Sequence, residues 1–162
     1  MNCLAWNCRG FGNCRGFGNL RTGKELVEII QAKDPSIVFI AETWTDEVRL
    51  DRVQQEIKFE NKWVVSSNNR GGGLVLFWKA SVNLTMEGSS KYYIDSYIDK
   101  NTENALRFTG FYDEPEMAKR WEAWNDLCSL INHSEIPWIS VRDFNEVTKQ
   151  CEKLGGALWN HN

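Results

Sequence analysis

"SIVFIAETW", residues 36–44, is the stretch of sequence that decides the fold. Its first six residues, Ser36–Ala41, form a continuous apolar and β-branched run that lacks the alternation of a half-exposed strand. Such a run predicts a strand that is buried on both faces. Glu42 follows at once, so a carboxylate stands at the carboxyl end of this strand, where sites often form in sheet proteins.

A helix is expected on each side of this strand. The upstream helix runs from about Thr22 or Lys24 to Lys33 and ends before Asp34-Pro35, because proline disfavours a helical residue before it. Its apolar face is Leu26, Ile29 and Ile30. The downstream helix is expected to have Thr45 as its N-cap and to place Val53 and Ile57 on its buried face.

The rest of the chain alternates between further strands and one more helix. Asn68–Gly73 predicts a turn between two strands of a hairpin. A helix is expected from near Pro115, and the helical spacing of its large apolar residues predicts one face packed in the core. Those residues are Met117, Trp121, Trp124, Cys128 and Ile131. The expected strands are Cys3–Trp6, Trp63–Val65, Leu74–Trp78, about Val82–Met86, Tyr92–Ile98, Ala105–Tyr112 and Pro137–Val141. The fold class is therefore α/β or α+β, in one domain over residues 1–162.

Composition excludes several classes of protein. The net charge of -3 excludes a chain that is strongly basic throughout. Residues 1–24 nevertheless hold four basic residues and no acid, which suits either a phosphate contact or a solvated loop. The five cysteines show no C-x-x-C spacing, so we expect no zinc site and reduced thiols in an intracellular protein. No signal peptide or membrane-spanning run is visible.

Polar residues follow four of the expected strands: Asn7, Glu42, Tyr112, and Asp143 with Asn145. Carboxylate and amide oxygens suit a hard cation such as magnesium, and a carboxylate beside it can orient a water for attack on phosphate. Acids at strand ends are common in α/β proteins, so the spacing alone leaves other roles open. Asn7 and Asn145 could be loop caps, Glu42 a charge at a helix entry, and Tyr112 an aromatic at the rim.

Five stretches in order carry a family resemblance. They are "LAWNCRGFGN" (4–13), "IVFIAETW" (37–44), "GGGLVLFWK" (71–79), "RFTGFYDEP" (107–115) and "PWISVRDFNEV" (137–147) with "EKLGG" (152–156). Together they resemble the endonuclease/exonuclease/phosphatase family, in the form found in plant LINE-type (non-LTR) retrotransposon endonuclease domains. The resemblance implies a four-layered α/β/β/α sandwich and cleavage of DNA phosphodiesters that depends on magnesium or manganese.

The resemblance also implies a role for each residue at the strand ends. Glu42 would bind the metal with Asn7 beside it, and Tyr112 would contact the scissile phosphate. Asp143 would align or activate the water, and Asn145 would hold the phosphate. A nuclear location and DNA as partner follow from the resemblance alone; the oligomeric state does not follow from it.

Three departures from the family pattern argue for lost activity. Arg142 stands where the family usually has glycine before the aspartate, and Asp113, which we expect in a surface turn, stands where glycine often follows the tyrosine. The family's closing Ser-Asp-His motif is absent from the sequence. We therefore expect a domain truncated at its C-terminus, with an exposed sheet edge and apolar surface. The alternative function is a catalytically inactive remnant or nucleic-acid-binding fragment; a small-molecule phosphatase is less favoured.

The hexapeptide CRGFGN occurs twice in tandem, at residues 8–13 and 14–19. It matches neither a Walker loop nor a dinucleotide fingerprint. Extra residues in a surface loop cost only about 0.6 kcal/mol per doubling of length, so an unselected duplication is tolerated. The functional alternative is a longer basic loop in which Arg9 and Arg15 contact the nucleic-acid backbone.

Overall fold

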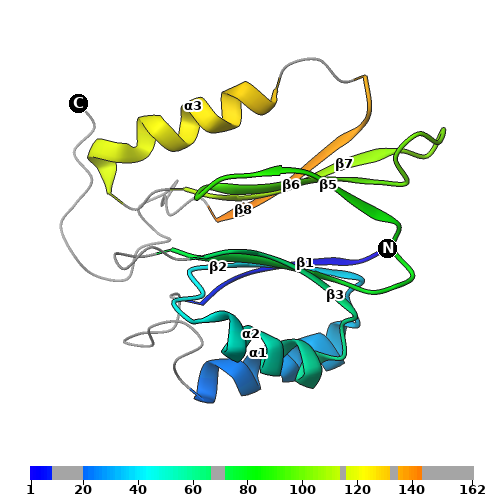
Figure 1. Cartoon of the computed structure of the whole chain (residues 1–162), viewed down its shortest axis with the longest axis vertical. Coiled ribbons are helices and arrows are strands. Elements are labelled where there is room, and N and C mark those ends of the chain that lie inside the picture. The colour runs from blue at the N-terminus through cyan, green and yellow to red at the C-terminus, as the bar shows by residue number, and fades with distance from the viewer. Residues whose placement is uncertain (9–19, 67–71, 114–115, 132–134, 144–162) are drawn as a thin grey trace, which may run out of the picture.

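Two four-stranded sheets pack face to face, and helices cover the outer face of each sheet (Figure 1). The structure, a computed structural model, describes residues 1–8, 20–66, 72–113, 116–131 and 135–143. Its elements are β1 (Cys3–Asn7), α1 (Leu20–Lys33), β2 (Ile37–Ala41), α2 (Glu47–Ile57), β3 (Asn61–Val65), β4 (Leu74–Trp78), β5 (Leu84–Ser89), β6 (Tyr93–Ile98), β7 (Leu106–Tyr112), the 3-10 turn η2 (Met117–Lys119), α3 (Arg120–Leu130) and β8 (Trp138–Asp143). The expected four-layered sandwich of mixed α/β class is confirmed.

The first sheet has the strand order β1-β2-β4-β3. β1 and β2 are parallel and joined through α1, whereas β4 pairs antiparallel with both β2 and β3. The expected hairpin of β3 and β4 is therefore present. β2 is buried along its whole length, because α1 and α2 cover one face of the sheet and the second sheet covers the other.

The second sheet has the order β5-β6-β7-β8. β5, β6 and β7 form an antiparallel meander, and β8 returns parallel to β7 after the chain has passed through α3. α3 covers the outer face of this sheet (Figure 1). The buried part of its contact with the sheet includes Ala123 and Leu127, which pack against Tyr92 and Phe111.

The two sheets approach each other closely at Gly110 on β7. A Cβ atom at this position would lie 2.2 Å from the ring of Phe39 on β2, far inside van der Waals contact. Glycine is therefore required here so that the Phe39 ring can fill the space between the sheets.

A buried ion pair fixes the end of α3 on the second sheet. Nη2 of Arg107 on β7 lies 2.8 Å from Oδ2 of Asp95 on β6, and both side chains are almost fully buried. Nη1 of the same arginine donates to the carbonyl oxygen of Leu130 at the end of α3, at 2.5 Å. Asp95 also accepts from Thr109, which in turn accepts from Trp138 Nε1. The carboxylate thus organises β6, β7, β8 and the helix through one network.

Three sequence-based expectations about local structure are wrong. The N-cap of α2 is Asp46, whose Oδ1 accepts a hydrogen bond from the Arg49 amide at 2.8 Å, and not Thr45. Asp113 is buried, with 1% of its surface exposed, and does not sit in a surface turn. The third error concerns the buried face of α3.

Most of the large apolar residues expected on the buried face of α3 do not lie there, although the Trp124 ring has its centroid 6.4 Å from that of Phe111 on the sheet. Met117 belongs to η2, and its side chain lies outside the described part of the structure. Trp121 is 63% exposed and Ile131 57%, and Cys128 is also exposed. The sheet contacts the neighbouring stripe of Ala123 and Leu127 instead. Both sets of residues have helical spacing. The prediction chose the set with the larger apolar side chains as the buried face, and that choice was wrong.

Candidate functional site at the carboxyl ends of four strands

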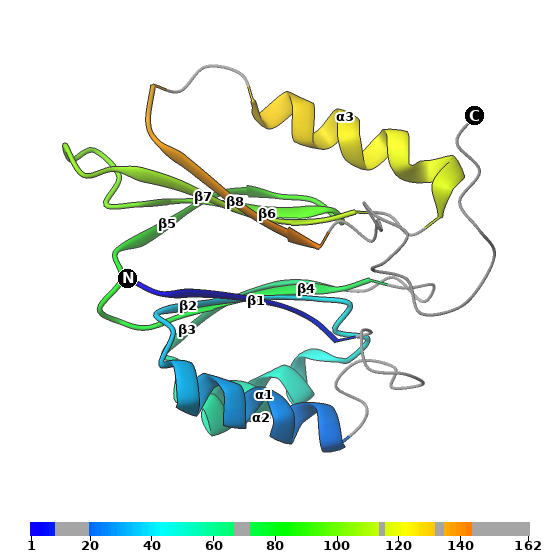
Figure 2. The same ribbon diagram turned by 180° about the vertical axis from the view of Figure 1, so that it is seen from behind.

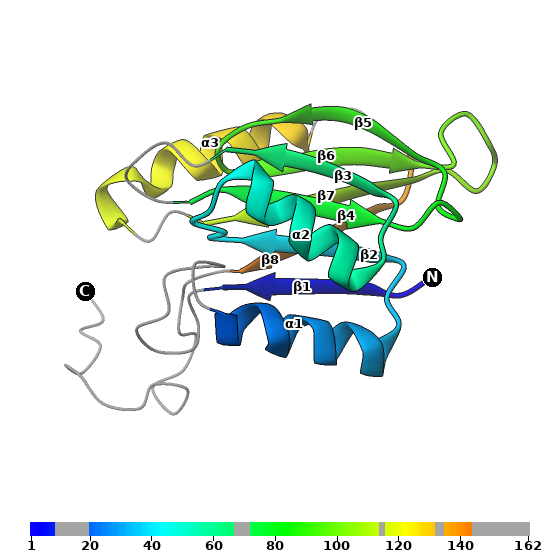
Figure 3. The ribbon, with the colours of Figure 1, turned by 60° about the horizontal axis from the view of Figure 1, so that its bottom comes forward.

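The expected site residues lie where the strands of both sheets end. β1 runs parallel to β2, and β7 runs parallel to β8. The two strands of each pair therefore have their carboxyl ends on the same side of their sheet. The Tyr112 hydroxyl, from the end of β7, donates to Oε1 of Glu42, just beyond the end of β2. All four carboxyl ends therefore meet at the same end of the sandwich, as Figure 3 shows.

Strand register places Asn7 and Asp143 at this end. Asn7 pairs with Ala41, the residue before Glu42. Asp143 is the last residue of β8 and pairs with Tyr112. The structure thus brings Asn7, Glu42 and Tyr112 to one place, together with the backbone of Asp143. Asn145, Arg9 and Arg15 lie outside the described residues.

Glu42 is held by its backbone in an unusual conformation. Its φ is 56° and that of Trp44 is 45°, both in the left-handed region that costs a non-glycine residue about 1–2 kcal/mol. The amides of Thr43 and Trp44 donate to the carbonyl oxygens of Gly73 and Gly72, at 3.1 and 3.3 Å. These bonds turn the chain sharply at the strand end and set the direction of the Glu42 side chain. Strained residues of this kind concentrate at functional sites.

The two glycines have a conformational role that the sequence pattern missed. Gly72 and Gly73 have φ values of 86° and 85°, which favour glycine, and they present their carbonyl groups to the Glu42 turn. The signal was the run of three glycines, which we interpreted only as part of a hairpin turn.

The carboxylate of Glu42 is fully buried, with 0% of the residue exposed. Its negative charge contributes, after burial, to a raised pKa of the Cys8 thiol, so Cys8 lies within electrostatic reach of it. Tyr112 is 5% exposed and packs among the residues between the sheets. A buried carboxylate with a phenol donor is thus held rigidly at this end of the sandwich.

The oxygen donors at this end suit a small hard cation. Glu42 offers carboxylate oxygens, and Asn7 comes from the adjacent strand, one register position earlier. No group of three or more His, Cys, Asp or Glu side chains that could hold a metal occurs in the part of the chain that the structure describes. Magnesium does not require such a group, because one or two carboxylates and several waters suffice.

The fold is that of a known protein family. The chain matches the model of the Endonuclease/Exonuclease/phosphatase family over residues 4–146 and belongs to that family. No curated protein matches the chain.

Solved structures share the fold at low sequence identity. The endonuclease domain of TRAS1, a telomere-specific non-LTR retrotransposon, superposes with a TM-score of 0.58 at 12% identity, covering 91% of this chain and 60% of that one. TDP2 of D. rerio, complexed with a single-strand DNA product, has a TM-score of 0.64 at 11% identity, covering 91% and 61%. The AP endonuclease LMAP of Leishmania major has a TM-score of 0.64 at 11% identity, covering 95% and 58%. The chain thus spans about three fifths of the length of these proteins.

None of the helices in the described residues is both long and apolar enough to cross a membrane.

Proposed function

We propose that this domain is a metal-dependent phosphodiesterase, of endonuclease type, that acts on DNA. The observation that carries the proposal is the hydrogen bond from Tyr112 to Glu42, which joins the carboxyl ends of strands from both sheets. Asn7 and Asp143 end the adjacent strands in register with these positions. Derivation from a retroelement is supported by the likeness to the TRAS1 domain, and action on DNA by the likeness to TDP2 and LMAP.

Glu42 and Asn7 are the residues that would hold the metal ion, and magnesium or manganese fits their oxygen donors. The ion would supply charge stabilisation at the phosphate oxygens. A carboxylate has about four lone-pair positions, so Glu42 can accept from Tyr112 and still bind a cation. The tyrosine keeps the carboxylate at a fixed orientation, which lowers the reorganisation needed for binding.

The remaining residues would act on the water and the phosphate. Asp143, the last residue of β8, would accept a proton from the attacking water or orient it. Asn145 would donate from its amide to a phosphate oxygen, and the Tyr112 phenol lies at the same end of the sandwich for a phosphate contact. We further infer that residues 1–162 act as one domain, because both sheets contribute to the site.

A non-catalytic, DNA-binding remnant is the second candidate. The observation in its favour is Arg142 directly before Asp143. A neighbouring positive charge lowers the pKa of a carboxylate and so weakens it as a base. In this case the site would bind metal and phosphate without turnover.

Nicking of supercoiled plasmid with magnesium tests the proposal. The chain is compared with Glu42→Gln, Asp143→Ala and Arg142→Gly, and with Glu87→Gln as a control for an exposed glutamate on β5. Titration with manganese, followed by the EPR signal of the free ion, measures metal binding separately. Circular dichroism establishes that each variant is folded.

Three outcomes are distinguishable. Nicking that needs magnesium and is lost in Glu42→Gln and Asp143→Ala, but kept in Glu87→Gln, supports the nuclease. Binding of manganese and DNA without nicking supports the remnant. This holds whether Arg142→Gly gains nicking activity or also shows none. A folded chain in which Glu42→Gln leaves manganese binding unchanged contradicts both.

A further inference from the structure

Trp44 is the first side chain to reach the surface as the chain leaves β2. Residues 37–43 are all buried, with 0% of Glu42 and 1% of Thr43 exposed, whereas Trp44 is partly exposed. The turn from β2 into α2 lies at the end of the sandwich toward which β1 and β8 run (Figure 2). Trp44 thus follows the candidate metal ligand by two residues and belongs to the rim of the candidate site.

The hydrophobic core does not account for this tryptophan. Trp44 belongs to none of the three hydrophobic clusters that the described residues form, and it is not among the partly buried side chains packed against them. No aromatic ring of the described residues stacks on its indole either. Trp6, Trp78 and Trp138 differ in this respect, because each packs against one of the clusters.

The backbone at Trp44 is unfavourable for a large aromatic residue. Its φ of 45° lies in the left-handed region, where glycine, asparagine or aspartate would be less strained. The hydrogen bond from the Trp44 amide to the Gly72 carbonyl holds the turn in this form. Strained residues that their surroundings hold in place are concentrated at active sites and ligand contacts. The position therefore suits an indole that serves a ligand and not the fold.

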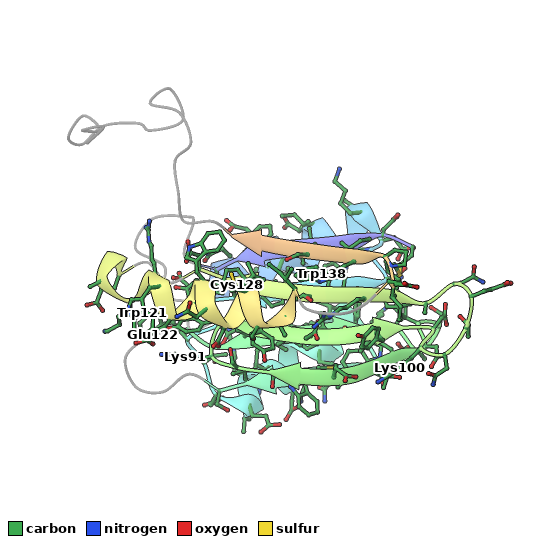
Figure 4. The ribbon with its side chains drawn as sticks, turned by 90° about the horizontal axis from the view of Figure 1, so that it is seen from above. Lys91, Lys100, Trp121, Glu122, Cys128 and Trp138 are labelled. Carbon is green, nitrogen blue, oxygen red and sulfur yellow. The ribbon has the colours of Figure 1, made fainter. Side chains whose placement is uncertain are left out.

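Exposure alone would not single out Trp44. Trp121 is 63% exposed on α3, on the outer face of the second sheet (Figure 4), and Trp63 is 42% exposed on β3. Neither of them has a positive φ, and Nε1 of Trp63 already donates to Oγ of Ser89 at 3.2 Å. Among the tryptophans that the structure describes, Trp44 alone combines left-handed backbone with a place beside Glu42.

We propose that Trp44 stacks on an unpaired base of the DNA, next to the phosphate at the candidate site. The inference rests on the proposed function and adds the substrate class, which is single-stranded DNA or a duplex with a base out of the stack. In an intact duplex the neighbouring bases cover both faces of each base, so an indole can stack only on a base that has left the helix. Aromatic stacking tolerates every base, and the preference is therefore for unpaired DNA and not for a sequence.

The turn prepares Trp44 for this role. A tryptophan has only two side-chain torsions, and the hydrogen bonds to the carbonyl groups of Gly72 and Gly73 fix the backbone from which it extends. Little conformational freedom is then lost when a base binds. Because the same turn directs Glu42, the metal ligand and the stacking residue keep a constant spacing. A phosphate at the metal and the adjoining base on the indole would thus be held together.

Binding of a short fluorescein-labelled single strand, and of the same strand annealed to its complement, tests the inference by fluorescence anisotropy. Calcium replaces magnesium as the oxygen-ligated cation, to limit cleavage during the measurement. Trp44→Ala should weaken binding of the single strand by about 5- to 150-fold, the range for one base stacked on an aromatic side chain, and binding of the duplex far less. Trp44→Phe should retain most of the affinity. Trp63→Ala, at an exposed tryptophan within β3, is the matched control and should retain all of it.

Trp44→Gly separates stacking from stability. Glycine adopts the left-handed backbone without strain, so this variant should unfold at a urea concentration at least equal to that for Trp44→Ala. It should nevertheless bind the single strand as weakly as Trp44→Ala does, because both lack the ring. Binding that follows stability across the three Trp44 variants would show a role in folding alone and overturns the inference. Circular dichroism establishes that each variant is folded.

Strands that carry one abasic position identify the contact itself. In the parent chain, omission of the stacked base should weaken binding by about the same factor as Trp44→Ala. The two changes together should cost no more than either one alone, since both remove the same interaction. Fully additive losses at every abasic position, or unchanged binding in a folded Trp44→Ala, overturn the inference. Nicking and manganese binding that persist in that case leave the proposed function standing, whereas a folded parent that binds neither form of DNA overturns both.

Discussion

The hydroxyl of Tyr112 donates a hydrogen bond to Oε1 of Glu42, although 70 residues separate the two in the chain. One comes from the end of β7 and the other from just beyond β2, so the bond crosses from one sheet to the other. Both residues are buried. The bond therefore couples the orientation of the candidate metal ligand to the packing of the sandwich.

Tyr112→Phe should destabilise the protein, because it deprives a buried carboxylate oxygen of a donor. Loss of a partner of this kind costs about 1–3 kcal/mol. We expect the free energy of unfolding in urea to fall by that amount. Tyr97 on β6 is only partly buried, so Tyr97→Phe should lower the free energy of unfolding much less. Equal effects of the two substitutions would show that the bond to Glu42 contributes little.

Gly110→Ala should be among the most damaging small substitutions in the chain. The added methyl group would lie 2.2 Å from the Phe39 ring, and only a shift of that ring or of a strand could relieve the overlap. Overpacking of this kind costs about 1–3 kcal/mol or more.

Gly88→Ala on β5 is the matched control, because its nearest neighbour would be the Tyr93 hydroxyl at 4.0 Å. Thermal unfolding should show a clearly lower midpoint for Gly110→Ala. The midpoint of Gly88→Ala should be almost the same as that of the parent. Gly110→Ala combined with Phe39→Leu should recover part of the loss. A Gly110→Ala midpoint equal to that of the parent would contradict the close approach of the sheets.

The sequence predicted strands and their polar ends well, because local patterns determine both. The buried run before Glu42 and the glycine-rich hairpin turn were sufficient to place β2, β3 and β4. The bond between Glu42 and Tyr112 was out of reach, because it depends on how two sheets stack and not on any local pattern. The left-handed backbone of Glu42 was missed for the same reason, since the carbonyl groups that accept from the Thr43 and Trp44 amides belong to a distant pair of glycines.

Side-chain size misled the prediction for α3. Trp121 and Ile131 suggested the buried face, but the sheet beneath the helix leaves room for the smaller Ala123 and for Leu127. Asp95 and Arg107 gave no sequence signal of their buried pairing, because alternating polar residues in a strand ordinarily indicate a solvated face.

Asp95→Asn should destabilise the protein strongly, because it leaves the buried Arg107 guanidinium without a counter-ion. The cation persists in the variant, because a guanidinium is not deprotonated in proteins. Removing one partner of a buried pair costs about 3–5 kcal/mol.

Asp51→Asn serves as the comparison, since Asp51 pairs with Lys62 while half exposed. Such surface pairs contribute about 1 kcal/mol or less. Urea unfolding of the two variants should therefore differ clearly. If Asp95→Asn unfolded at the same urea concentration as Asp51→Asn, the network would not be what fixes α3.

The contact of Lys91 with Glu122 should make the docking of α3 sensitive to acid. Hydrogen bonds from Lys91 and, second, from Tyr92 lower the pKa of Glu122 below its usual value of 4.5. The ionised Glu122 therefore stabilises the folded protein fully at a pH above its usual pKa. This stabilisation is lost as the pH falls through the lowered pKa of the folded state. Glu122→Gln should show a flatter decline of the thermal midpoint between about pH 5 and pH 3. Parallel declines in the two proteins would mean that the contact does not contribute.

Cys8 and Cys128 should differ sharply in reactivity toward a disulfide reagent. Burial, and then the negative charge of Glu42, raise the pKa of the Cys8 thiol, whereas Cys128 is exposed on α3. Because the thiolate is the reactive form, Cys8 should remain unlabelled near neutral pH while Cys128 reacts. Mass spectrometry of the labelled peptides separates the two, and labelling in urea confirms that both can react. Glu42→Gln should hasten the labelling of Cys8 by removing the adjacent charge. Labelling of Cys8 at the rate of Cys128 in the folded chain would contradict its burial beside the candidate metal ligand.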